Sequence, residues 1–109
     1  MIGVEPGEPD RSKRLAGLYS PYFMMGTALH GDGLYRQALI HLDEALGLNR
    51  DSPAAWYFRG YTLLALGREQ EALAAFDRVE ELDPDNERAM ADVAAVRRQF
   101  QAPPLADDQ

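Results

Sequence analysis

The chain of 109 residues repeats itself with a period of 34 residues. When residues 19–52 are compared with residues 53–86, eight positions are identical: Gly26 with Gly60, Leu29 with Leu63, Gly33 with Gly67, Ala38 with Ala72, Leu39 with Leu73, Asp43 with Asp77, Leu48 with Leu82 and Asp51 with Asp85. A fixed period in this range is typical of stacked helical units, each of which buries its apolar face against the next. Such stacks usually present a surface to a partner, so the period favours a binding function.

The apolar residues recur at helical spacing and never alternate with period two over any length. We therefore predict an all-α chain of about five helices, arranged as an α-solenoid of antiparallel helix pairs. The expected units are a first pair at 19–52, a second pair at 53–86 and a capping helix at 87–102. A flexible segment at 1–18 precedes them, with a short helix expected at 10–19, and a loose tail at 103–109 follows.

Serine, proline and glycine mark the helix ends. Ser20–Pro21 and Ser52–Pro53 each read as an N-cap followed by proline at the first helical position. Gly33 and Gly67 predict the ends of the first helix in each pair. Asp83–Pro84 predicts the end of the fourth helix, after which Asp85 or Asn86 caps the fifth.

Small residues recur in phase inside the predicted helices, at Gly26, Gly60, Ala38 and Ala72. Glycine within a helix costs about 1 kcal/mol relative to alanine. Its recurrence predicts a place where two helices approach closely, with Leu42 and Phe76 filling the neighbouring space. On the last helix we expect Ala89, Met90, Val93, Ala94 and Phe100 to form the apolar side.

The formal net charge is −7, and the acid concentrates in residues 77–92, which hold seven acids against two arginines. Such a surface repels phosphate backbones, so nucleic acid is not an expected partner and a basic partner is favoured. No apolar run reaches the roughly 18 residues that a membrane span needs. The first residues lack the basic-then-apolar order of a secretory signal. The absence of cysteine excludes disulfides and fits a reducing cytoplasm, where we expect the protein.

These residues resemble the tetratricopeptide repeat family over 19–86, and more weakly over 87–100. The family pattern reads Trp56, Gly60, Leu63, Gly67, Ala72, Phe76 and Asp83–Pro84 in the second repeat, and Tyr22, Gly26, Leu29, Gly33, Ala38 and Leu42 in the first. Two positions depart from it. Arg50 replaces the proline that ends the second helix, so we expect that helix to run on slightly. Arg59 stands where leucine is usual, and we expect its stem to lie along apolar surface.

The resemblance implies a concave groove lined by the first helix of each pair. The residues in phase to contact a partner are Phe23, Met24, Thr27, His30, Tyr57, Phe58, Tyr61, Leu64 and Arg88. The rings among them predict an exposed aromatic cluster, and an alternative is that some pack against neighbouring helices. The family's clamp for a peptide's terminal carboxylates is absent, because only Arg88 fits it. We expect a protein or peptide with apolar anchors and basic flanks.

An enzyme reading would rest on His30 and His41, each two residues before an acid. These histidines fall in different helices, so we interpret them as separate surface residues and expect no metal. The sequence holds no nucleophile motif and no phosphate-binding glycine loop, so we expect neither catalysis nor a cofactor. The alternative to an adaptor is a structural protein whose groove or open end, with Leu15, Leu18 and Tyr22, is buried in a homodimer.

Overall fold

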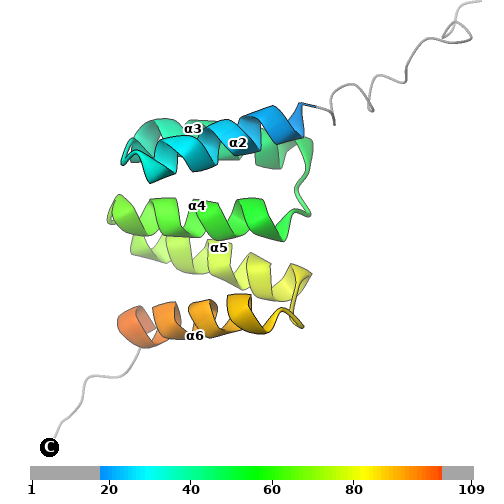
Figure 1. Ribbon diagram of the computed structural model, residues 1–109. Helices are drawn as coiled ribbons and strands as arrows, with labels where there is room; N and C mark the ends of the chain where they lie inside the picture. Colours follow the sequence, from blue (N-terminus) through cyan, green and yellow to red (C-terminus); the bar gives the residue numbers. More distant parts are fainter. Residues whose placement is uncertain (1–17, 102–109) are drawn as a thin grey trace, which may run out of the picture.

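The computed structural model describes residues 18–101, which form five α-helices and no strand. The helices are α2 (Tyr19–Gly31), α3 (Tyr35–Leu48), α4 (Pro53–Ala65), α5 (Glu69–Leu82) and α6 (Glu87–Gln101). Consecutive helices pack against one another, and the stack runs in chain order from α2 and α3 through α4 and α5 to α6 (Figure 1). This confirms the predicted all-α solenoid. The expected tail at 103–109 and most of the expected helix at 10–19 lie outside the described residues.

Within residues 18–101, none of the helices has the length and apolar character required to cross a bilayer.

The two serine–proline pairs behave differently at the helix starts. Ser52 caps α4 as predicted, because its hydroxyl oxygen accepts the N–H of Ala55 at 3.2 Å and Pro53 is the first helical residue. The predicted cap at Ser20 is wrong, since α2 begins at Tyr19 and Leu18 stands at its N-cap. Pro21 is then the third helical residue, where the missing N–H would have had no partner within the helix anyway. Helix α2 can therefore begin before Ser20 and include Pro21 without losing a hydrogen bond.

The helices of the two repeats end at equivalent positions, more closely than the sequence alone predicts. Gly33 and Gly67 adopt φ of 81° and 78°, the left-handed conformation that allows the chain to turn after α2 and α4. The expected run-on of α3 at Arg50 is wrong, because α3 ends at Leu48 and α5 ends 34 residues later at Leu82. The side chain of Asn49 accepts the N–H of Asp51 at 3.1 Å, so an asparagine turn ends α3 without a proline.

Close contacts at the two in-phase glycines hold each helix pair together. A Cβ at Gly60 would lie 2.7 Å from two ring carbons of Phe76, and one at Gly26 would lie 2.7 Å from Cγ of Leu42. Phe76 and Leu42 are among the largest fully buried side chains of the described residues. The predicted packing role of the glycines is therefore confirmed: the large side chain of one helix fills the space that the glycine of the other leaves open.

Apolar residues at the two ends of the stack differ in how far they are buried. Met25 is 51% exposed, because the described residues contain no helix pair before α2 to cover it. On α6 the buried positions are Ala89, Val93 and Val96, while Ala94 is exposed. Ala94 is wrong as a core position because one residue along a helix turns the side chain by about 100° from that of Val93.

Replacing Gly60 with alanine tests the close contact directly. The new methyl group collides with Phe76, so Gly60→Ala should lower the free energy of unfolding by about 1–3 kcal/mol despite the better helix propensity of alanine. Gly47→Ala is the matched control, because Gly47 lies in α3 with open space around it and should gain up to about 1 kcal/mol. Urea denaturation measures both, and equal effects at the two glycines would contradict the packing account.

Candidate functional site

Rings from α2 and α4 meet along one face of the stack. Phe58 of α4 lies between Phe23 and His30 of α2, with ring centroids 5.8 Å and 6.0 Å apart and edge-to-face geometry in both pairs. Phe23 and His30 are seven residues apart, so they project from the same side of α2. All three rings are half-buried. The contacts join the two repeats and leave part of each ring at the surface.

A hydrogen-bond chain fixes the orientation of His30. The hydroxyl of Thr62 donates to the carbonyl oxygen of Phe58 at 2.7 Å, and the hydroxyl oxygen of Thr62 lies 2.9 Å from Nδ1 of His30. Because the hydroxyl proton is already used, Nδ1 of His30 carries the proton and donates, which leaves Nε2 as an acceptor. Burial lowers the pKa of His30 below its ordinary value of 6.5, so the imidazole is neutral at pH 7.

The two tyrosines of α4 pack inward rather than standing free. Tyr61 lies edge-to-face against both Tyr57 and the buried Phe76, with ring centroids 5.0 Å apart in each case. The sequence predicts exposed rings at Phe23, Tyr57, Phe58 and Tyr61, and the structure leaves all four half-buried. The expected exposure of these four rings is wrong because the rings partly cover one another and pack on the buried core.

A hydrogen bond joins α4 to the capping helix α6. The hydroxyl of Tyr57 donates to Oδ2 of Asp92 at 2.6 Å. Burial, the hydrogen bond to Asp92 and nearby charge raise the pKa of Tyr57 far above its usual value, so this phenol stays protonated. With the α2–α4 contacts, this bond places α2, α4 and α6 along one continuous face, called the α2–α4–α6 face below.

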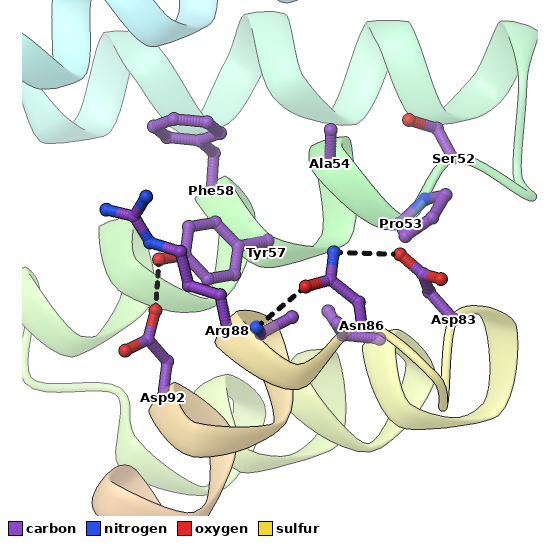
Figure 2. Close-up of a pocket in the computed structure, with 11 residues that line it drawn as sticks. Ser52, Pro53, Ala54, Tyr57, Phe58, Asp83, Asn86, Arg88 and Asp92 are labelled. Atoms are coloured by element: carbon purple, nitrogen blue, oxygen red, sulfur yellow. Dashed lines mark hydrogen bonds between the residues drawn. The ribbon is translucent and has the colours of Figure 1, made fainter.

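A pocket of about 530 Å³ opens on this face between the N-terminal halves of α4 and α6. Figure 2 shows Tyr57, Phe58 and Ala54 on its α4 side, with Arg88 and Asp92 on its α6 side. Three of the predicted site residues, Tyr57, Phe58 and Arg88, line the pocket. Reasoning from sequence missed Ala54, Asp83 and Asn86. Helical spacing from Phe58 points to Ala54, but Asp83 and Asn86 reach the pocket only through the turn before α6.

The remaining predicted residues lie on α2 and α4 outside the pocket. Met24 is 66% exposed, while Thr27 is half-buried and its hydroxyl donates to the carbonyl oxygen of Met24 at 3.0 Å. Leu64 is half-buried against the core. The face therefore brings together residues from both repeats and α6, with Met24 and Arg88 the most accessible of those predicted.

The histidines do not form a joint site. Nδ1 of His41 lies 3.0 Å from Oε1 of Glu44 on α3, whereas His30 contacts Thr62 of α4. In the described part of the chain, no three His, Cys, Asp or Glu side chains gather in a metal-binding arrangement. His30 differs from the expected surface histidine, because its ring is half-buried against Phe58.

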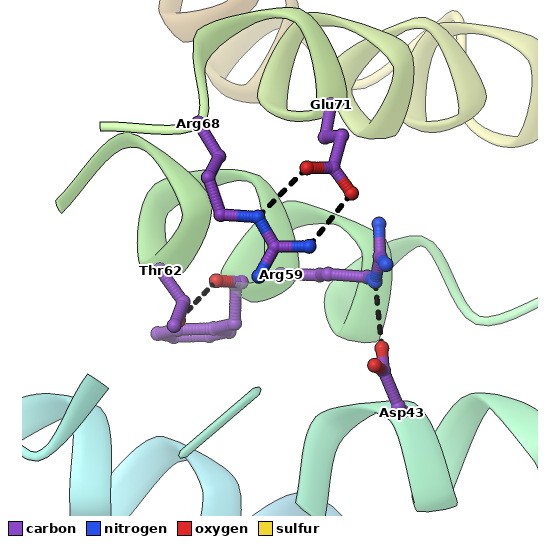
Figure 3. A network of polar contacts seen from close by, with 6 residues as sticks. Asp43, Arg59, Thr62, Arg68 and Glu71 are labelled. Atoms are coloured by element: carbon purple, nitrogen blue, oxygen red, sulfur yellow. Dashed lines mark hydrogen bonds and ion pairs between the residues drawn. The ribbon is translucent and has the colours of Figure 1, made fainter. Parts of the chain in front are cut away.

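Arg59, the departure from the usual leucine, is held by an ion pair and an aromatic ring. Its Nε lies 2.6 Å from Oδ1 of Asp43 (Figure 3). Its guanidinium carbon lies 5.8 Å from the centre of the Trp56 ring. A separate pair lies at the start of α5, where a direct hydrogen bond from Arg68, the residue before the helix, lowers the pKa of the Glu71 carboxyl group. These contacts connect α3 with α4 and stabilise the start of α5.

The antiparallel helix pairs recur every 34 residues, and α2, α4 and α6 lie along one face. This arrangement defines a helical-repeat protein of the solenoid class. A family model described as tetratricopeptide repeat matches residues 23–87. This match covers more than half of the chain, so the chain belongs to the tetratricopeptide repeat family. A search of curated proteins found no match. The family consists of protein–protein interaction modules that are typically not catalytic, and this is the general class of function it supports for the chain.

Removing the Tyr57 hydroxyl tests the bond between α4 and α6. Tyr57→Phe leaves a carboxylate without its donor, so the free energy of unfolding should fall by about 1.5 kcal/mol. Tyr35→Phe is the control, because the Tyr35 hydroxyl has no hydrogen-bond partner among residues 18–101 and its loss should cost under about 0.5 kcal/mol. Chemical denaturation measures the free energy of unfolding of both variants. Similar losses of that free energy would rule out a specific contribution from the bond to Asp92.

The lowered pKa of His30 predicts a pH dependence of stability. The unfolded chain, with the ordinary pKa of 6.5, binds the proton more readily than the folded chain. Stability is therefore lost as the pH falls below about 6.5. Between pH 7.5 and 5, wild type should lose more free energy of unfolding than His30→Asn, whose amide nitrogen takes the place of Nδ1 towards Thr62 but gains no charge. Parallel losses in the two proteins would show that His30 titrates normally.

Proposed function

We propose that the chain is an adaptor that binds a peptide or an extended segment of another protein on the α2–α4–α6 face and catalyses no reaction. The observation that carries this proposal is the pocket between α4 and α6, which adjoins the half-buried rings of Phe58 and Tyr57. Pockets floored by aromatic side chains suit apolar anchors of a bound segment. The family of the chain supports a protein partner in general.

In this proposal the nine residues predicted from the sequence have different parts. Met24 and Arg88 are the exposed residues of this surface, and Phe23, Phe58 and His30 offer partly exposed ring edges to the partner. Thr27, Leu64, Tyr57 and Tyr61 support the face. The proposed boundaries are a first repeat at 19–52, a second at 53–86 and a capping helix at 87–102. The partner carries apolar anchors for the rings and basic groups for the acid of residues 77–92.

Self-association is the second candidate function, and one observation favours it. The exposed large apolar side chains of residues 18–101 all belong to the first repeat or its lead-in, namely Leu18, Met24, Met25, Leu34 and Ile40. Exposed apolar surface of this kind marks interfaces. Light scattering over a wide concentration range separates the two functions. A monomer at all concentrations excludes the assembly, whereas a dimer that Met25→Lys dissociates favours it over the adaptor.

Two variants, each with an alanine replaced by arginine, test the adaptor proposal. A peptide is first selected from a random phage-displayed library on the full chain, and its dissociation constant is measured by fluorescence polarisation. Ala54→Arg fills the mouth of the pocket from an exposed helical position and should weaken binding at least about tenfold, or about 1.4 kcal/mol.

Ala74→Arg is the matched control, because Ala74 is an exposed alanine of α5 outside the pocket, and it should bind within about twofold of wild type. Circular dichroism checks that both variants fold. Failure to select any peptide, or equal affinities for the two variants, would contradict the proposal.

A further inference from the structure

The pocket between α4 and α6 contains two carboxylates with only neutral hydrogen-bond donors. Oδ2 of Asp92 accepts the hydroxyl of Tyr57 at 2.6 Å, and Oδ2 of Asp83 accepts the side-chain amide of Asn86 at 3.1 Å. Neither carboxylate forms an ion pair with any residue from 18 to 101. Both line the pocket, so its wall carries two negative charges that are not in ion pairs.

Most of the rest of the pocket wall is aromatic or aliphatic. The rings of Tyr57 and Phe58 come from α4, and Val79 and Ala89 add aliphatic surface from α5 and α6. A side chain that fits such a wall has an apolar stem for the rings and a positive head group for the carboxylates. Lysine and arginine have this form, and a cation near an aromatic face gains further attraction when it is partly desolvated.

Arg88 is the cation that already lies at this pocket. Figure 2 shows its side chain extending from α6 towards α4, beside Tyr57 and Phe58. Two carboxylates against one arginine leave a net negative charge, and the segment 77–92 around the pocket holds seven acids against two arginines. Because Arg88 is exposed, a bound cation can displace it into solvent.

We propose that this pocket receives a lysine or arginine side chain of the bound segment, a statement that rests on the proposed function of the α2–α4–α6 face. The aliphatic stem packs on Tyr57 and Phe58, and the positive head group pairs with Asp83 and Asp92. Arg88 is then a competing cation that limits affinity, and not a contact that the partner needs. The pocket thereby selects segments with a basic residue beside their apolar anchors.

Two small probes of similar length and opposite charge test this assignment without any partner. The ¹⁵N-labelled full chain is titrated with n-butylguanidinium and, separately, with pentanoate, and backbone amide shifts are followed by NMR. Butylguanidinium should shift the amides of Ala54, Phe58 and Ala89 in a saturable manner, and pentanoate should not. Stronger shifts from pentanoate, or no saturable shift from butylguanidinium, would overturn the proposal.

Charge variants locate the binding to the pocket. Asp83→Asn and Asp92→Asn keep the shape of the side chain and should each weaken butylguanidinium at least threefold, whereas Arg88→Gln should strengthen it. Asp85→Asn is the matched control, because Asp85 belongs to the same acidic turn but does not line the pocket, and it should leave the affinity unchanged. An equal loss of affinity in Asp85→Asn would show that the effect comes from general surface charge, and this would overturn the proposal.

The outcome is separable from that of the proposed function. If pentanoate binds the pocket in place of the cation while selected peptides still lose affinity to Ala54→Arg, the adaptor function stands and the basic anchor is wrong. If butylguanidinium binds as expected but no peptide is selected on the face, the pocket prefers cations and the adaptor function is wrong.

Discussion

The contact of a glycine with a large side chain, made once in each helix pair, is the constraint on which the rest of the structure depends. Gly60 admits the ring of Phe76, and Gly26 admits Leu42, to distances that no Cβ would allow. This close approach sets how α4 lies on α5 and how α2 lies on α3. Since both pairs have the same geometry, they stack in a regular way, and α2, α4 and α6 follow one another along one face.

The functional proposals depend on that face through contacts that the repeat does not preserve. Phe58 lies between Phe23 and His30, and Tyr57 is hydrogen-bonded to Asp92 of α6. Such contacts stabilise the stack and also shape its surface, because each ring is half-buried. The pocket between α4 and α6 follows from the same arrangement. Its charge and its aromatic wall come from residues specific to the second repeat and the cap.

The sequence predicts the scaffold well because the scaffold is made of local signals. Gly33, Gly67 and Ser52 act through their own backbone geometry or a neighbour three residues away, so reading the chain in order finds them. The pocket depends on residues about 30 positions apart, such as Tyr57 and Asp92, whose meeting requires the relative placement of two helices. The exposure of Met25 and the tautomer of His30 likewise depend on neighbours from other elements.

The central claim is that partners bind the α2–α4–α6 face, and NMR shift mapping with a selected peptide tests it most directly. The account predicts that the perturbed amides cluster on α2, α4 and the first turns of α6, with the largest changes at Ala54, Phe58 and Arg88. Perturbations concentrated on α3 and the outer side of α5, with the pocket residues unchanged, would contradict it.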